Sequence, residues 1–236
     1  MISERKGDLF KPGEIDLVVF DLGGTVIKDT GAVPEAFTVA LHNEGIDISD
    51  DLLRQFRGAS KREVIRRLVE ERSREAGPDM NARCERIFRE FRELVSKGFT
   101  EGGLAVIAGA EDTFGWLRTG GIKVAINSGF DRAITSLVLD SLGWETAIDA
   151  AVCGDDVSMG RPAPYLIFRV METTGATSVR RVVNVGDTVF DLQAGWNAGV
   201  RGNVGVLSGA HGREDLERAP YSHLLTSVAD LPSLFE

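Results

Sequence analysis

Five polar side chains with catalytic potential are spread along the chain. Asp21, Ser128 and Asp187 each follow a short apolar run, and Asp191 follows Asp187 by four residues. Arg161 lies in a Gly-Arg-Pro segment before an expected helix. Ligands of open α/β sheets bind beyond the carboxyl ends of the strands, so we expect these residues to converge. Neighbouring carboxylates repel one another unless a cation lies between them.

This set of side chains suits a phosphoryl group held with a metal ion. Mg²⁺ prefers carboxylate and carbonyl oxygens, so we expect Asp21 and Asp187 to hold it. Arg161 and the Ser128 hydroxyl could then bind the remaining phosphoryl oxygens. A helix that starts after Ser128-Gly129 adds backbone N–H donors.

The elements that must position these residues alternate between strands and helices. Short runs rich in valine and isoleucine predict strands at 15–20, 122–127, 150–153, 181–185 and 204–207. Amphipathic segments between them predict helices at 111–118, 131–142, 164–173 and 192–198. This alternation predicts a doubly wound, Rossmann-like α/β core with a parallel sheet that is covered on both faces.

Residues 33–101 have a different pattern, with apolar residues at helical spacing and no convincing strand. Turn and capping signals divide them into four helices: Gly45, Ser49, Gly58, the capping-box pair Ser60 and Glu63, the break at Gly77-Pro78, and an end near Gly98. We therefore predict an α-helical cap domain over residues 31–102, inserted into a core formed by residues 1–30 and 103–236.

Composition restricts the classes of partner. The chain has 27 Lys and Arg against 36 Asp and Glu, a formal net charge of −9. This charge repels nucleic acid and anionic membranes, so we expect neither as a partner. Cys84 and Cys153 are too few for a disulfide framework, and residues 1–10 lack the apolar segment of a signal peptide. We expect a cytoplasmic protein that is a monomer or a homodimer.

The ordered motifs resemble those of the haloacid dehalogenase superfamily. They are Asp21-Leu22-Gly23-Gly24-Thr25, Ser128, Arg161, and Gly186-Asp187 followed by Asp191. The resemblance implies that Asp21 is a nucleophile that becomes an aspartyl-phosphate. It also implies a phosphate site at Gly24, Ser128, Gly129 and Arg161, with Arg161 in place of the usual lysine. Mg²⁺ would be held by Asp21, the Gly23 carbonyl and Asp187, with Asp191 orienting the metal's waters or the arginine.

Gly23 departs from the pattern of the superfamily's phosphatases. These carry an aspartate two residues after the nucleophile, and it protonates the leaving alcohol. Phosphonoacetaldehyde hydrolases (phosphonatases) also lack that aspartate, because their cap lysine forms a Schiff base that accepts the electrons of the leaving carbon. Gly58-Ala59-Ser60-Lys61 resembles the segment with that lysine, so Lys61 is the candidate. Val64 and Phe130 depart from this group, which has a histidine and a tyrosine there.

The sequence therefore predicts a Mg²⁺-dependent, phosphonatase-like hydrolase that acts on a small phosphonate or phosphorylated metabolite. Three alternatives stay open. The chain could be a phosphate-monoester phosphatase similar to phosphoglycolate phosphatase, a haloacid dehalogenase, or a catalytically silent binding protein.

Overall fold

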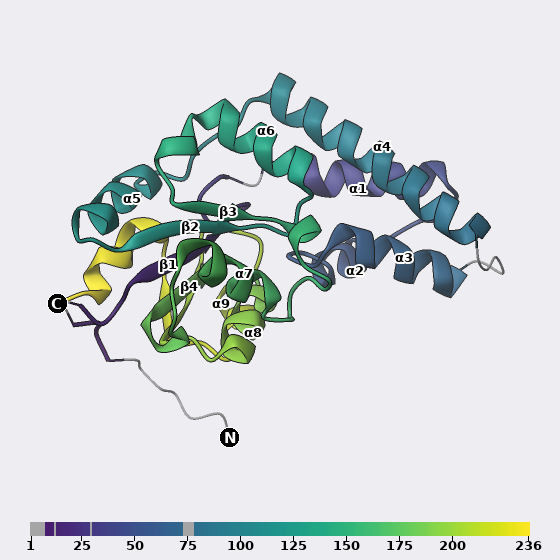
Figure 1. The fold of residues 1–236 in the computed structure, drawn as a ribbon. Helices are drawn as coiled ribbons and strands as arrows, with labels where there is room; N and C mark the ends of the chain where they lie inside the picture. Colours follow the sequence, from purple (N-terminus) through teal and green to yellow (C-terminus); the bar gives the residue numbers. More distant parts are fainter. Residues whose placement is uncertain (1–7, 12, 29, 73–77) are drawn as a thin grey trace.

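The computed structural model describes residues 8–11, 13–28, 30–72 and 78–236. Residues 1–7 and the predicted break at Gly77 lie outside them. Six parallel strands in the order β3-β2-β1-β4-β5-β6 form the centre of the molecule (Figure 1). They are β1 (Leu17–Asp21), β2 (Lys123–Asn127), β3 (Ala150–Val152), β4 (Val182–Gly186), β5 (Gly202–Val206) and β6 (His223–Leu225).

β1 is the strand on which the site depends, because it lies between β2 and β4. Its last residue, Asp21, pairs in register with Asn127, the last residue of β2. The residues that follow these three strands therefore meet at one edge of the sheet. The strand order also reverses direction beside β1, which is where ligands bind in doubly wound sheets.

Helices cover both faces of the sheet, as the sequence predicts (Figure 1). Val18 and Phe20 of β1 share an apolar cluster with helices α5 (Ala110–Thr119) and α6 (Arg132–Leu142). Leu17 and Val19 point the other way and cluster with α7 (Tyr165–Thr174) and α8 (Val189–Ala198). The shorter helices are η1 (Trp144–Thr146), η2 (Gly154–Asp156), η3 (Val179–Arg181), α9 (Arg213–Leu216) and η4 (Val228–Leu234).

Four helices are inserted between β1 and α5, and we call residues 32–102 the helical block. They are α1 (Ala32–Asn43), α2 (Asp50–Gln55), α3 (Lys61–Arg72) and α4 (Pro78–Gly102). The long helix α4 packs against α1 and α3, and it runs beside α6 of the core (Figure 1). One apolar cluster joins Phe37 and Phe91 of the block to Phe20 and Phe114 of the core. The division into two domains at 30/31 and 102/103 stays a prediction.

Some element ends differ from prediction for local reasons. Helix α4 does not end near Gly98 but continues to Gly102. Gly98 lies close to α1, since a Cβ there would lie 3.0 Å from the Ala32 Cβ. Helix α8 begins at Val189 and not at Leu192, because Thr188 is its N-cap. The sequence pattern predicts neither β6 nor α9, which are only a few residues long. Within the described residues, no helix combines the length and the apolar character needed to cross a membrane.

Candidate active site

The candidate site lies at the carboxyl edge of the sheet, where loops from separate strands meet. Asp21 ends β1, Ser128 follows β2 directly, and Asp187 follows β4 directly. Arg161 comes from the segment between η2 and α7. All four residues are buried. The predicted convergence of these residues is therefore observed.

Three aspartates form a buried carboxylate cluster. Asp21, Asp187 and Asp191 each place one carboxylate oxygen within 4.8 Å of the others. Their exposed fractions are 6%, 1% and 2%. Burial and mutual repulsion both disfavour this much negative charge, and a bound cation would relieve both. The oxygen donors are those that Mg²⁺ prefers, so the residues present fit this ion.

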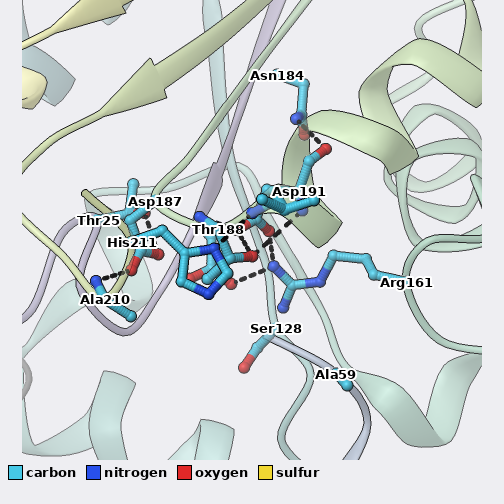
Figure 2. Close-up of polar contacts among 12 residues, drawn as sticks. Thr25, Ala59, Ser128, Arg161, Asn184, Asp187, Thr188, Asp191, Ala210 and His211 are labelled. Carbon is cyan, nitrogen blue, oxygen red and sulfur yellow. Dashed lines mark hydrogen bonds and ion pairs between the residues drawn. The ribbon is translucent and has the colours of Figure 1, made fainter. Parts of the chain in front are cut away.

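Asp187 is held by two hydrogen bonds (Figure 2). The Thr25 hydroxyl donates to its Oδ1 at 3.1 Å, and the backbone N–H of Ala210 donates to its Oδ2 at 2.7 Å. Burial, together with the negative charge of Asp21, raises the pKa of Asp187 to about 7. The carboxylate is thus fixed in place, yet its charge is costly without a positive partner.

Arg161 connects two of the three carboxylates (Figure 2). Its Nη1 lies 2.7 Å from Oδ1 of Asp21, and it also pairs with Oδ1 of Asp191. Oδ2 of Asp191 accepts hydrogen bonds from the backbone N–H and the hydroxyl of Thr188, at 2.9 and 2.5 Å. Among the described residues, the Nε of Arg161 meets no acceptor in hydrogen-bond geometry, whereas Nη1 faces the two carboxylates. The carboxylates therefore fix the position of the guanidinium.

The loop after β1 approaches the cluster so closely that Gly24 leaves no room for a side chain. Gly24 has φ of +83°, and a Cβ there would lie 2.3 Å from Oδ2 of Asp187. A glycine is therefore needed for both the backbone conformation and the close contact. Gly23 differs, since a Cβ there would meet nothing within 4 Å. Packing therefore does not explain why position 23 has glycine and not aspartate.

A single pocket joins this cluster to the helical block. The core contributes mainly polar residues: Asp21, Gly23, Ser128, Gly129, Phe130, Arg161, Asp187, Thr188 and Ala210. The block contributes an apolar wall and two cations: Ala32, Val33, Pro34, Leu53, Phe99, Arg57 and Lys61. The rings of Phe99 and Phe130 meet edge to face across the boundary, with 6.2 Å between their centroids. The pocket is thus mainly polar on the side of the core, and mainly apolar with two cations on the side of the block.

Lys61 lines this pocket from the first turn of α3. Its Nζ donates to the carbonyl oxygens of Phe56 and Ala59, at 3.1 and 3.3 Å. It also lies 5.5 Å from the ring centroid of Phe37. Two carbonyl oxygens and an aromatic face are surroundings that stabilise the ammonium form.

The other predicted site residues occupy different places. Gly24 and Asp191 do not line the pocket but lie behind it, against Asp187 and Arg161 respectively. Val64 is buried in the apolar cluster and does not line the pocket, whereas Phe130 does. Asp191 occupies the third helical position of α8, where it forms a capping box with Thr188.

Sequence reasoning missed several residues of the site. Thr188 and Ala210 support Asp191 and Asp187 through backbone N–H groups, which carry no side-chain signal. His211 links the core to the block. Its Nδ1 accepts from the backbone N–H of Val189 at 3.0 Å, and its Nε2 lies 3.4 Å from the carbonyl oxygen of Arg54.

Comparisons with known proteins agree with this architecture. Residues 18–204 match the model of a family described as haloacid dehalogenase-like hydrolase. The chain is 32% identical over 209 residues to the phosphonoacetaldehyde hydrolase of Latilactobacillus sakei, which covers 82% of this chain and 76% of the relative. It is 28% identical over 208 residues to that of Bacillus cereus, which covers 84% and 77%.

A solved structure has a similar fold. It is that of a phosphonoacetaldehyde hydrolase-like protein from Oleispira antarctica, with a TM-score of 0.79 and 22% identity. The match covers 97% of this chain and 94% of that one. The similarity thus includes the helical block as well as the sheet.

Proposed function

The chain belongs to the haloacid dehalogenase-like hydrolases, and on that premise we propose that it is a Mg²⁺-dependent phosphonatase-like enzyme with Asp21 as nucleophile. Its substrate would be a small phosphonate. The observation that carries the proposal is the shared pocket, which is lined by Asp21, Arg161 and Lys61 at once. The glycine at position 23 supports the same reading, because C–P cleavage through an imine needs no acid there.

Asp21, Asp187 and the Gly23 carbonyl would hold Mg²⁺, with Asp191 orienting the arginine or the metal's waters. When bound, the ion supplies positive charge that offsets the carboxylates and polarises a phosphoryl oxygen. Arg161 and the Ser128 hydroxyl would hold the other phosphoryl oxygens, with the backbone N–H of Gly129. The backbone N–H of Gly24 does not serve this role, because it donates to the carbonyl oxygen of Ile27 at 2.7 Å. Ser128, Gly129 and Arg161 all line the pocket, which supports this assignment.

The Asp21 carboxylate would then attack phosphorus. An oxygen–phosphorus bond forms as the bond from phosphorus to the leaving carbon breaks. If Lys61 has formed an imine with the substrate aldehyde, the electron pair moves into the imine and the carbon departs as an enamine. Water then cleaves the aspartyl-phosphate, releases inorganic phosphate and restores Asp21. Protonation of the enamine carbon and hydrolysis of the resulting imine release the aldehyde product and restore the Lys61 amine.

The size of the pocket favours a small substrate. Its volume of about 110 Å³ is below the roughly 300–1,000 Å³ of pockets that hold drug-sized ligands. We therefore expect small substrates to be preferred over bulky aryl esters.

The contacts of Lys61 favour a second candidate, a phosphate-monoester phosphatase. An amine attacks an aldehyde only when neutral, yet the Lys61 amine is held by two carbonyl oxygens that stabilise its charge. In an ester hydrolase, Lys61 would stay protonated and bind an anionic part of the substrate.

One experiment separates the two candidates. Phosphate release from phosphonoacetaldehyde and from a panel of small phosphate monoesters is measured with Mg²⁺ and with EDTA. We expect the phosphonate to be preferred, and EDTA to abolish turnover. Lys61→Ala and Lys61→Arg should both be inactive on the phosphonate, because neither forms an imine.

Borohydride with substrate should also trap a covalent adduct on the wild type but on neither variant. Preference for esters, with Lys61→Arg still active, would reject C–P cleavage and leave the phosphatase. Absence of Mg²⁺-dependent phosphate release from any substrate would reject both.

A further inference from the structure

The first turn of α3 contacts the site in two directions. Lys61 extends into the pocket, and two residues later Glu63 reaches the core. The Ser60 and Glu63 pair has capping-box spacing, and the Ser60 hydroxyl does accept from the Glu63 backbone N–H, at 3.4 Å. The Glu63 carboxylate, however, accepts a hydrogen bond from the backbone N–H of Gly160 at 2.8 Å. A residue with a local capping pattern thus makes a contact 97 positions along the chain.

The contact point on the core is the residue immediately before Arg161. Gly160 is buried, and a Cβ there would lie 3.0 Å from the Ser60 Cβ, so the two segments are tightly packed. Arg161 itself is 4% exposed and pairs with Asp21 and Asp191. A hydrogen bond that fixes the Gly160 backbone therefore restricts where the Arg161 side chain starts.

The loop before α3, residues 56–60, makes a second contact with the core. Gly58 has φ of +80°, and a Cβ there would lie 2.3 Å from the Thr188 hydroxyl oxygen. Thr188 in turn holds Asp191, the other partner of Arg161. The loop before α3 and the first turn of α3 thus contact the two core segments that position the guanidinium, at Thr188 and at Gly160.

We propose that Glu63 is a positioning residue that couples the helical block to Arg161. Through Gly160, it places the guanidinium for the phosphoryl group at the same time as the first turn of α3 places Lys61. This inference rests on the proposed function, in which Arg161 binds that group. Because sites need their groups held within roughly 0.5 Å, losing this single contact should weaken phosphate binding without unfolding the protein.

The test compares two substitutions of Glu63 with a matched control. Glu63→Ala removes the acceptor, whereas Glu63→Gln keeps a carbonyl oxygen that can accept from Gly160 and removes only the charge. Glu71→Ala removes an exposed glutamate from the last turn of the same helix, where its partner among the described residues is Arg67 of the same helix. Affinity for inorganic phosphate in the presence of Mg²⁺ is measured by calorimetry, and kcat and KM are measured on the best substrate.

We expect Glu63→Ala to weaken phosphate binding and lower kcat/KM about tenfold, the scale of one hydrogen bond to a charged group. Glu63→Gln should stay within about threefold of the wild type, and Glu71→Ala should be unchanged. Unchanged binding in Glu63→Ala overturns the proposal. An equal loss in both Glu63 variants also overturns it, because the charge and not the contact would then matter.

Hydrogen exchange gives a readout that does not depend on activity. The Gly160 amide should exchange faster in Glu63→Ala than in the wild type, as seen in a peptide covering residues 157–166. A peptide from α6 should be unchanged. If the wild type binds no phosphate, the proposed function fails, and equal exchange at Gly160 in both proteins would separately refute the contact.

Discussion

The sheet core and the helical block are stabilised in different ways. Every residue of β1, β4 and β5 is buried. Helix α3 of the block buries only one face, formed by Val64, Ile65, Leu68 and Val69. Its other face carries exposed ion pairs such as Arg66–Glu70 and Arg67–Glu71, which contribute little to stability, about 0–1 kcal/mol each.

The proposed roles in the reaction are divided between the core and the block in the same way. The buried core supplies the residues that need fixed geometry, namely Asp21, Arg161, Asp187 and Asp191, each held by neighbours that leave little freedom. The block supplies half-buried residues, Lys61 and Arg57 among them, that line the pocket opposite this cluster. In the proposed function, the buried core would carry out the reaction and the block would contact the rest of the substrate.

The largest expected effect comes from the centre of the core. Asp21→Asn removes the nucleophile, so kcat should fall by at least about 10⁴-fold. The carboxamide is close in size to the carboxylate, so the circular dichroism spectrum should not change. Asp140→Asn, at an exposed position of α6, is the control and should keep full activity. Substantial turnover in Asp21→Asn would contradict the assigned nucleophile.

The second prediction adds a function to the core. Gly23→Asp places a carboxylate in open space beside Asp21, where it can act as a general acid. Hydrolysis of small phosphate monoesters should rise by about 10²-fold, the lower end for acid–base catalysis. Gly23→Ala, which adds a Cβ without an acid, should show no gain. An equal gain in both variants would mean that the effect is steric.

The third prediction concerns the contact between Gly58 of the block and Thr188 of the core. Gly58→Ala introduces a Cβ against the Thr188 hydroxyl, so the loop that carries Lys61 must shift. We expect kcat/KM to fall about tenfold, together with a loss of about 1–2 kcal/mol of stability from the positive φ. Gly45→Ala has a similar φ, +75°, but nothing lies within 4 Å of its Cβ. Gly45→Ala should therefore lower the stability by a similar amount and leave kcat/KM unchanged.

The smallest prediction concerns charge within the block. Glu44 joins α1 to α4 by pairing with Arg86 and Arg83, at 2.9 and 3.5 Å, and its side chain is 23% exposed. The hydrogen bond from Arg86 lowers the pKa of Glu44 below its ordinary value of 4.5. A lowered pKa contributes stability that is present above pH 4.5 and is lost as the pH falls through the folded-state value.

Glu44→Gln should therefore cost about 1 kcal/mol in urea unfolding at pH 7. The difference from the wild type should shrink as the pH falls below 4.5. Glu71→Gln is the control, since its pair with Arg67 is about half exposed and local to one helix. It should change stability less, and a pH-independent loss in Glu44→Gln would argue against the charge as the cause.

The sequence by itself determined the sheet and its polar edge. The apolar run that ends at Asp21, and the runs before Ser128 and Asp187, are local features, and parallel strands place their carboxyl ends together. The helical block was also predictable, because amphipathic spacing and capping residues act over one or two turns. Short β6 was not, since three residues carry too little pattern.

Only the tertiary structure decided how the block meets the core. Lys61 lines the pocket and Val64 does not, a choice made by how α3 packs. Glu63 has a local capping pattern, yet its carboxylate bonds to Gly160, and the Ala210 support of Asp187 comes from a backbone N–H. The physical reason is that local patterns record a residue's own turn, whereas contacts between distant segments depend on how whole helices pack against the sheet.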